Sequence, residues 1–335
     1  MDKFALSKTD TLVLKGFAII GMLFWHLFFA PNPVGVFFSQ PLRFISIIGD
    51  FCVSAFLFCS GYGLAASYSS TKDRKIGVFI GRRLWKFYFN FWFIFIVFVP
   101  IGIFVMDNPL DTTPNAITAW LEQIMALSWH QSYNSAWWFN SLIIRYYIVF
   151  PLLFYLIKKN VFVTLISLIL GTYGFFKSES YIVIYAIGII WFMYNRKISR
   201  FMSSSSKPLI ILILNVILVV SLLCLYLMGE KSIFLRGLPV YGIITIYLAI
   251  SIKFMNHNKK YQILALLGKH SANIYMIHSF LYFYWFPDFF YSLNPLIMFC
   301  LLIGSSYLIS LLIEKTKEIT GWNNLATTVP AFVYK

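Results

Sequence analysis

Apolar runs about as long as a membrane is thick recur along this chain, with only short polar gaps between them. A helix of about 20 apolar residues crosses the hydrocarbon core of a bilayer, and its backbone hydrogen bonds are satisfied internally, as that interior requires. Eight clear runs cover residues 11–30, 45–66, 84–106, 136–157, 207–228, 236–254, 262–284 and 292–313. The stretch 161–194 fits two more if it turns at residues 174–180. The sequence therefore predicts an all-α, polytopic membrane helical bundle of about ten transmembrane helices.

The composition agrees with lipid as the solvent of this chain. Hydrophobic residues make up 60% of it and charged residues only 12%, whereas soluble domains carry about 25% charged residues. The formal net charge of +15 does not indicate a nucleic-acid binder, because such a protein needs its cations on a solvent-facing stripe. Here they occupy the gaps between apolar runs. We therefore expect membrane lipid, and no nucleic acid, as a partner.

The positions of the cations predict the topology. Lys and Arg are enriched in cytoplasmic loops, and most of them fall in alternate gaps counted from a cytoplasmic N-terminus. The longest of the opposite gaps, 107–135, holds no cation, and the others hold only Arg43, Lys177, Lys231 and Arg236. Ten spans with both termini in the cytoplasm satisfy the rule throughout, whereas nine would break it.

The chain shows no sign of a second domain. The first apolar run follows basic residues and has no small-residue cleavage site after it, so we expect it to be retained as the first span. Without an internal repeat, heptad array or soluble appendage, the pattern predicts one membrane domain over residues 1–335. No CxxC spacing occurs, so we expect no metal site, and we interpret the four cysteines as small buried hydrophobic residues: Cys52, Cys59, Cys224 and Cys300.

Ionisable residues inside the spans are few, and each is a candidate functional residue because charge at membrane depth is unfavourable. Lys15 and His26 in the first span lie about 16 Å apart along a helix axis, the first near the cytoplasmic mouth and the second near the outer end. Asp50 begins the second span at a depth similar to that of His26. A carboxylate that holds an imidazole fixes its tautomer and raises its basicity, which is the arrangement of a general base.

Each of these residues also has a structural interpretation. His26 fits a helix-bridging hydrogen bond as well as a catalytic role, and Asp50 fits a position in the headgroup region. His278, which also reaches the outer half of its span, fits a structural role better than a functional one.

A cationic run, KDRKIGVFIGRRLWKFYFNFW, precedes and enters the third span. Most such runs anchor the cytoplasmic end of a span or contact anionic lipid headgroups. At helical spacing, Arg82, Arg83 and Lys86 could instead form a site for phosphates together with Lys15. Both interpretations are open at this point.

The run SAWWFNSLIIRYYIVFPLL, residues 135–153, carries a third candidate group. We expect Trp137 and Trp138 at the outer interface, where aromatic side chains form a belt. Arg145 lies inside the span, so its guanidinium should face the bundle or a wet cavity. A sugar or carboxylate site explains this arginine, and so does a structural pair with an acid.

In this order, the motifs resemble those of the acyltransferase 3 family of membrane proteins. LKGFAIIGMLFWH, with Lys15 and His26, resembles the family's first span. GDFCVSAFLFCSGYGL resembles its second, with Asp50 at the acidic position and Ser60 and Gly61 at its Ser-Gly. FIGRRLWKFY, WWFNSLIIRYYIVFPLL and SANIYMIHSFL resemble its Arg-rich entry, its Trp-Phe-Tyr-Pro span and its late Ser-Tyr-His span.

The chain departs from the family's pattern at some positions. The family usually has Arg where Lys15 and Lys86 stand, and an Asp where this chain has Leu12. Lysine keeps the charge but lacks the bidentate fork of arginine.

The resemblance implies a reaction and a role for each group. Proteins of this family move acyl groups, commonly acetyl, onto extracytoplasmic carbohydrates, which implies acetyl-CoA as co-substrate and a cell-surface or lipid-linked glycan as acceptor at a bacterial plasma membrane. His26, oriented by Asp50, would be the catalytic base. The donor-binding residues would be Lys15, Ser60, Arg82, Arg83 and Lys86, and the acceptor-binding residues Trp138, Arg145, Tyr146 and His278. A homodimer is left open.

A transporter or flippase is the main alternative, because Lys15, His26, Asp50 and Arg145 could line a pathway for protons or for a polysaccharide-related or small anionic substrate. Such a protein would not need the cationic cluster, and the chain shows no inverted repeat. A polysaccharide polymerase would need a larger outer loop than 107–135, by analogy of fold alone. Binding or consumption of acetyl-CoA distinguishes the acyltransferase from a transporter, since a transporter should do neither.

Overall fold

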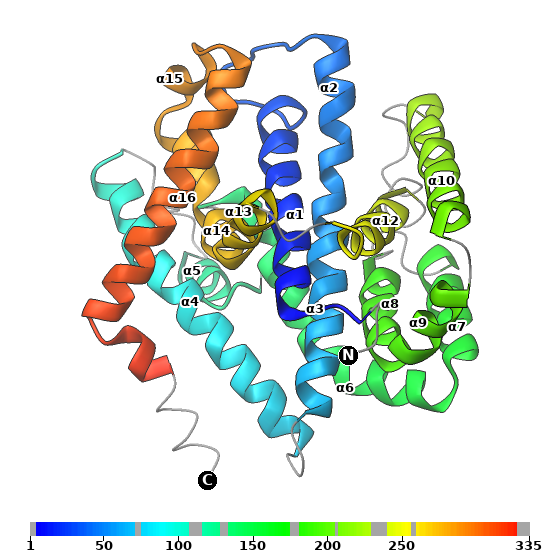
Figure 1. Ribbon diagram of the computed structural model, residues 1–335. Helices are drawn as coiled ribbons and strands as arrows, with labels where there is room; N and C mark the ends of the chain where they lie inside the picture. Colours follow the sequence, from blue (N-terminus) through cyan, green and yellow to red (C-terminus); the bar gives the residue numbers. More distant parts are fainter. Residues whose placement is uncertain are drawn as a thin grey trace. The chain divides into compact units, whose positions relative to one another are not determined.

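The computed structural model shows a chain built from helices (Figure 1). It describes residues 5–70, 75–106, 116–127, 133–174, 181–204, 207–228, 240–255 and 259–326. These residues contain no β-strand, which confirms the predicted all-α class. About half of the predicted outer loop 107–135 and most of the turn at 174–180 lie outside the described residues.

Five helices in the described ranges are long and apolar enough to cross a membrane. They are α1 (Lys8–Phe28), the continuous helix Gln40–Ser69, α4 (Ile76–Phe104), the helix Ser135–Lys159 and α16 (Pro295–Ile319). Gln40–Ser69 consists of α2 (Gln40–Ile47), the 3₁₀ helix η1 (Ile48–Asp50) and α3 (Phe51–Ser69). Ser135–Lys159 consists of η2 (Ser135–Trp137) and α6 (Trp138–Lys159). All five coincide with predicted spans, so this is a multi-pass membrane protein.

Further apolar helices lie where other spans are predicted. They are α7 (Val161–Gly174), α8 (Tyr181–Met193), α10 (Lys207–Met228) and α12 (Gly242–Ile252). Of these, α7, α8 and α12 are shorter than the roughly 20 residues that a full crossing needs. The total of about ten spans and the cytoplasmic placement of both termini stay predictions.

The predicted span 262–284 is wrong as a single helix. It is divided among α13 (Lys259–Lys269), α14 (Ser271–Ser279) and the π-helix η5 (Phe280–Trp285), which α15 (Pro287–Tyr291) follows. The break lies at His270, whose backbone is at φ −93° and ψ 3°. The His270 ring lies 2.9 Å from the Ser310 hydroxyl of α16. Such a tertiary contact cannot be inferred from hydropathy.

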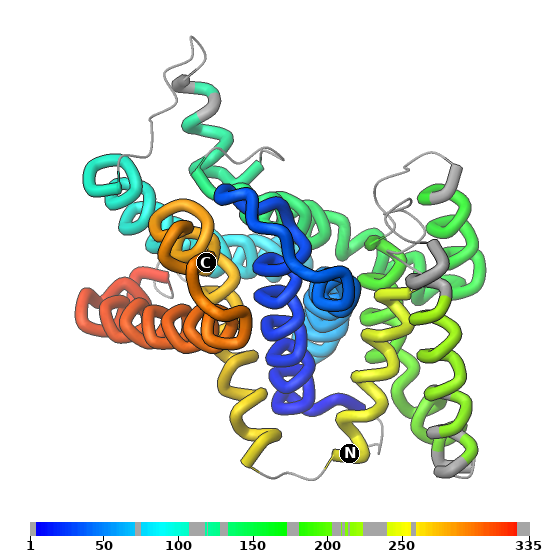
Figure 2. Tube along the Cα trace, turned by 90° about the horizontal axis from the view of Figure 1, so that it is seen from above, coloured from blue at the N-terminus to red at the C-terminus, as the bar shows by residue number. Residues whose placement is uncertain are grey.

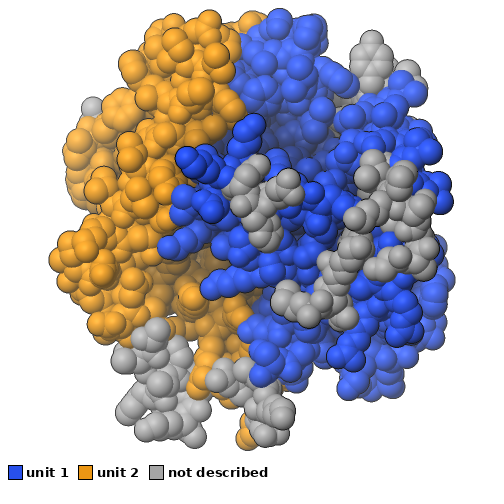
Figure 3. Space-filling view, viewed as in Figure 1, with its two compact units in different colours: residues 1–29, 38–72, 150–269 blue, residues 30–37, 73–149, 270–335 orange. Residues whose placement is uncertain are grey.

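The chain divides into two compact units whose segments alternate along the sequence (Figure 3). Unit 1 comprises residues 1–29, 38–72 and 150–269, and unit 2 comprises residues 30–37, 73–149 and 270–335. The last boundary falls at the break between α13 and α14. The single membrane domain over 1–335 stays a prediction.

In unit 1, glycines bring α1 and α13 into backbone contact. α12 and α13 pack on opposite sides of α1 (Figures 1 and 2). A Cβ added to Gly16 would lie 2.1 Å from the carbonyl oxygen of Leu264, and one added to Gly268 would lie 1.8 Å from that of Leu12. No other residue type fits at either position.

The pair α3 and α8 is joined in the same way. A Cβ on Gly61 would lie 2.2 Å from the carbonyl oxygen of Tyr185, and one on Gly188 would lie 2.3 Å from that of Phe58. Lipid is as apolar as leucine, so helices in a membrane associate through such close backbone packing. These glycines therefore hold unit 1 together.

The cysteines are partly as predicted. Cys52 and Cys59 are buried, whereas Cys300 is exposed on α16, a helix that also exposes Leu308 and Leu312. This apolar surface suits lipid contact, so burial was the wrong expectation for Cys300. The side chain of Cys224 lies outside the described residues.

The two glycines of α3 provide a matched test of this packing. We expect Gly61→Ala to lower the midpoint of thermal unfolding of the detergent-solubilised protein, because its methyl group meets the Tyr185 carbonyl; overpacking of this kind costs about 1–3 kcal/mol. Gly63→Ala is the control, since nothing lies within 4 Å of a Cβ there. Equal midpoints for the two variants would contradict the packing described.

Candidate functional site

Two glycines bring the helix turn that precedes His26 into contact with the residue that precedes Asp50. A Cβ added to Gly49 of η1 would lie 2.1 Å from the carbonyl oxygen of Gly21 in α1, and 3.1 Å from the Cβ of Trp25. His26 follows Trp25, and Asp50 follows Gly49. The structure thus brings together the two segments that the sequence predicts to meet.

The half-buried ring of His26 is oriented by the main chain of its own helix. Its Nδ1 lies 2.9 Å from the carbonyl oxygen of Met22. A carbonyl oxygen only accepts, so Nδ1 carries the proton and donates it, and in the neutral imidazole the lone pair is on Nε2. Trp25 packs edge-on against this ring, with the centroids 4.9 Å apart. The Met22 carbonyl therefore orients the ring through Nδ1, and the orienting role of Asp50 stays a prediction.

Lys15 and Ser60 lie half-buried on neighbouring helices of unit 1, α1 and α3. The Cys59 thiol donates to the carbonyl oxygen of Thr11 at 3.8 Å. Cys59 precedes Ser60, and Thr11 lies one turn before Lys15. The helix turns that carry these two predicted donor-binding residues are therefore neighbours.

A buried ion pair near the start of α1 was not predicted. Asp10 is 3% exposed, and its carboxylate accepts from the Lys253 ammonium at 2.6 Å and from the Tyr261 hydroxyl. Lys253 also donates to the carbonyl oxygen of Ala5 at 2.7 Å. Burial, and then the Asp10 carboxylate, raise the pKa of Tyr261, so its hydroxyl stays protonated. These contacts fasten the start of α1 to the segments that carry Lys253 and Tyr261.

Part of this arrangement has a sequence signature. Ser7 and Asp10 form a capping box, in which each side chain accepts from the backbone N–H of the other. Ser-x-x-Asp before an apolar run is recognisable in the sequence. For Lys253, in contrast, the sequence indicates only that it is one of the cations in a predicted cytoplasmic gap.

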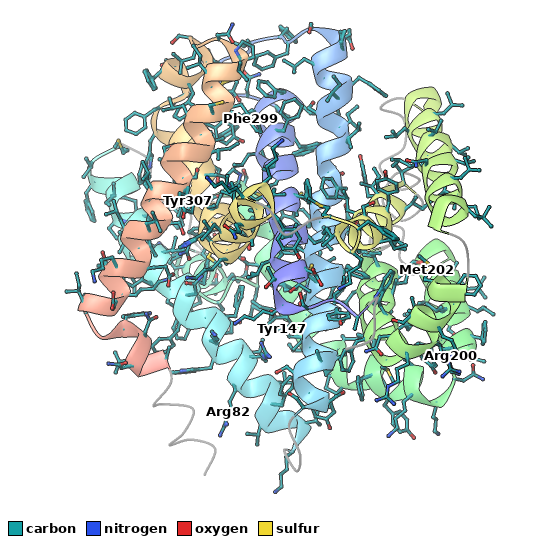
Figure 4. The ribbon with its side chains drawn as sticks, viewed as in Figure 1. Arg82, Tyr147, Arg200, Met202, Phe299 and Tyr307 are labelled. Carbon is teal, nitrogen blue, oxygen red and sulfur yellow. The ribbon has the colours of Figure 1, made fainter. Side chains whose placement is uncertain are left out.

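In unit 2, the predicted phosphate-binding cations lie on one face of α4. Arg82 and Arg83 are half-buried and Lys86 is exposed; Figure 4 labels Arg82. The Arg83 guanidinium lies 5.4 Å from the ring centroid of Phe79. The Arg82 Nε is buried and has no hydrogen-bond partner among the described residues, so this donor suits an external acceptor. The proximity of Lys15 to this cluster stays a prediction.

The predicted acceptor-binding residues of α6 differ in burial. Trp138 and Arg145 are half-buried, and Tyr146 is buried. Trp137, in contrast, is wrongly assigned to an interfacial belt. It is fully buried in unit 2, and its indole N–H donates to the carbonyl oxygen of Met276 at 2.9 Å.

His278 lies in the core of unit 2 and is fully buried. Its Nδ1 donates to the carbonyl oxygen of Tyr275 at 2.8 Å, and its ring stacks on Tyr282 with the centroids 6.1 Å apart. Next to it, the Ser279 hydroxyl donates to Asn134 at 2.7 Å. This packing favours the structural interpretation of His278, and its part in acceptor binding stays a prediction.

A second unpredicted polar cluster lies at the end of α16. Lys317 is 2% exposed; it forms an ion pair with Glu314 at 2.9 Å and a hydrogen bond to Asn90 of α4. Asn273 of α14 donates to the same Glu314 carboxylate at 2.8 Å. The cluster therefore joins α4, α14 and α16. Its one sequence signature is the Glu-x-x-Lys spacing on a helix.

Across the described ranges, His, Cys, Asp and Glu side chains form no group of three or more that could hold a metal ion. Proton transfer by His26 stays a prediction.

Comparison with known proteins adds one finding. A family model described as an acyltransferase domain, acyltransferase 3, matches residues 13–315. No curated protein and no solved structure matches the chain. The matched range contains all the predicted catalytic, donor-binding and acceptor-binding residues, but not Asp10 or Lys317.

The buried pair at the start of α1 should contribute strongly to stability. We expect Asp10→Ala to lower the free energy of unfolding by about 3 kcal/mol, because it leaves Lys253 buried without its counter-ion. The control is Glu318→Ala, which breaks the pair of Glu318 with Lys315, whose side chains are 68% and 65% exposed; exposed pairs contribute little. Thermal unfolding in detergent measures both, and an equally small effect of the two variants would refute a stabilising role for Asp10.

Proposed function

Because this chain belongs to the acyltransferase 3 family, we propose that it transfers an acetyl group from acetyl-CoA to a hydroxyl of a cell-surface or lipid-linked carbohydrate. Membership of the family makes it a membrane acyltransferase. The observation that carries the finer proposal is the ring of His26. Its Nδ1 lies 2.9 Å from the Met22 carbonyl oxygen, so in the neutral ring Nε2 carries the lone pair.

The proposed chemistry uses His26 as a general base. Nε2 takes the proton of the acceptor hydroxyl while the hydroxyl oxygen attacks the thioester carbonyl carbon. The tetrahedral intermediate then collapses, the carbon–sulfur bond breaks, and the imidazolium returns the proton to the departing thiolate. Asp50, held near His26 by the contact of Gly21 with Gly49, stabilises the imidazolium that forms between these steps.

The proposed donor site uses the cations of α4. CoA carries several phosphates, and arginine and lysine side chains bind phosphate oxygens through charge-assisted hydrogen bonds. Arg82 offers a buried Nε–H, and Arg83 and Lys86 lie on the same helix face. Lys15 and Ser60 line the path that we assign to the pantetheine arm toward His26.

The proposed acceptor site uses α6. Trp138 and Tyr146 provide aromatic faces against which the apolar face of a sugar ring packs, and the half-buried Arg145 donates hydrogen bonds to its oxygens. Holding donor and acceptor together beside His26 would remove much of the entropic barrier to the reaction.

A transporter also accounts for charged residues at membrane depth. The family match favours transfer over transport. Consumption of acetyl-CoA decides between the two functions.

Substitution of His26 tests the proposed base. We expect His26→Ala to reduce acetyl transfer from acetyl-CoA to a glycan acceptor at least about 100-fold, because the proton acceptor is lost, while membrane insertion and the unfolding midpoint are kept. His270→Gln is the control, as it changes a histidine that belongs to none of the proposed catalytic, donor-binding or acceptor-binding groups. Transfer by His26→Ala at the rate of the wild type would eliminate the mechanism.

The phosphate site is tested by comparing two donors. In the triple variant Arg82→Gln, Arg83→Gln and Lys86→Gln, we expect the KM for acetyl-CoA to rise about tenfold or more through lost phosphate contacts. The KM for acetyl-pantetheine, which has no phosphate, should not change. The triple variant Lys259→Gln, Lys260→Gln and Lys269→Gln removes the same charge from α13 as a control. Equal effects on both donors, or in both variants, would contradict a phosphate site on α4.

A further inference from the structure

A cavity of about 480 Å³ lies at one end of unit 1. The last turns of α3, α6 and α8 and the first turn of α9 (Asn195–Ser204) form it. The residues that line it are Ser69, Phe154, Lys158, Phe192, Met193, Asn195 and Arg196. None of them belongs to the proposed catalytic, donor-binding or acceptor-binding groups.

The cavity is positively charged. Lys158 and Arg196 line it, and the sequences of the four helices that form it contain no Asp or Glu. The adjacent cations Lys159 and Lys197 do not line the cavity and lie over the rings of Tyr155 and Tyr194, at 5.1 and 5.3 Å from their centroids. A cavity with such a charge suits an anionic ligand.

The wall of the cavity is aromatic and held in place by neighbouring rings. Phe154 packs edge-on against Tyr68, with the centroids 5.3 Å apart, and Phe192 packs edge-on against Tyr62 at 5.6 Å. Met193 adds a flexible apolar side chain. An alkyl chain fits such a wall, whereas a free inorganic anion gains nothing from it.

The helix α9 places this cavity at the membrane surface. Its exposed cations are Arg196, Lys197 and Arg200, and its apolar residues Ile198, Phe201 and Met202 follow on the neighbouring face; Figure 4 labels Arg200 and Met202. Phe201 is 71% exposed. A helix with this pattern lies in the plane of the interface, with its apolar face among the acyl chains. On the predicted topology, this interface is the cytoplasmic one.

We propose that the cavity binds the phosphate headgroup of an anionic glycerophospholipid. Lys158 and Arg196 contact the phosphate, Ser69 and Asn195 donate hydrogen bonds to it, and one acyl chain packs against Phe154 and Phe192. Basic pockets between membrane helices on the cytoplasmic side recognise lipid phosphates in this way. The inference does not depend on the proposed acyl transfer, because it concerns a different set of residues and is tested by binding.

The experiment measures binding of single phosphatidylglycerol molecules to the purified full chain in a neutral detergent by native mass spectrometry. We expect the double variant Lys158→Gln and Arg196→Gln to bind phosphatidylglycerol about 30-fold more weakly, since each cation contributes about 1 kcal/mol. The matched control, Lys159→Gln and Lys197→Gln, removes the same two charges from adjacent positions outside the cavity and should bind as the wild type does. Lys158→Arg with Arg196→Lys keeps both charges and should retain binding.

Other probes separate the sources of phosphate. Phosphatidylcholine should bind more weakly than phosphatidylglycerol, and glycerol 3-phosphate, which has the phosphate without acyl chains, should bind more weakly still. If the cavity variant and the control lose phosphatidylglycerol binding equally, the proposal is overturned, because the overall positive charge and not the cavity would then bind the lipid. Glycerol 3-phosphate that binds as tightly as the lipid would overturn it in favour of a soluble phosphate ligand. Unfolding midpoints of all variants without lipid show that each is folded.

Discussion

Close contact between helix backbones underlies the arrangement of unit 1. Apolar side chains gain little by leaving lipid, so the helices associate where small residues let their main chains meet. Gly16 and Gly268 do this for α1 and α13, and Gly61 and Gly188 do it for α3 and α8. A similar contact between α1 and η1 has a chemical consequence, because it places the segment of His26 beside that of Asp50.

The polar side chains of the described residues are arranged in two ways. The Asp10 carboxylate accepts from Lys253 and Tyr261, which lie on other segments of unit 1. The Glu314 carboxylate accepts from Lys317 of its own helix and from Asn273 of α14. Clusters of this kind satisfy buried charge and fasten helix ends. His26 differs from them. Its helix supplies a partner for Nδ1, and the tautomer that results makes Nε2 the atom suited to take a proton from a substrate.

Much of the fold could be predicted from the sequence, because the length of an apolar run and the sign of nearby charges depend on local residues and on the bilayer alone. The predictions failed where a tertiary contact decides. His270, whose ring contacts Ser310, interrupts the predicted span 262–284. Trp137 lies buried instead of at the interface, and its indole N–H donates to the carbonyl oxygen of Met276. For the site, spacing and resemblance predict His26 and Asp50 as catalytic residues, and the structure places their segments in contact. The Met22 carbonyl and the ion pair of Asp10 with Lys253 could not be predicted, since they depend on side-chain orientation and on residues far apart in sequence.

The central claim is that this membrane acyltransferase moves acetyl from CoA to a carbohydrate hydroxyl. The most direct measurement incubates the purified wild-type chain with acetyl-CoA labelled with ¹³C in its acetyl group and a panel of cell-envelope glycans, and determines the mass of each glycan and the amount of free CoA. The account predicts a labelled, base-labile acetyl ester on one class of glycan, with an equal amount of CoA released. Unlabelled glycans together with intact acetyl-CoA would contradict it and would make the transporter the better interpretation.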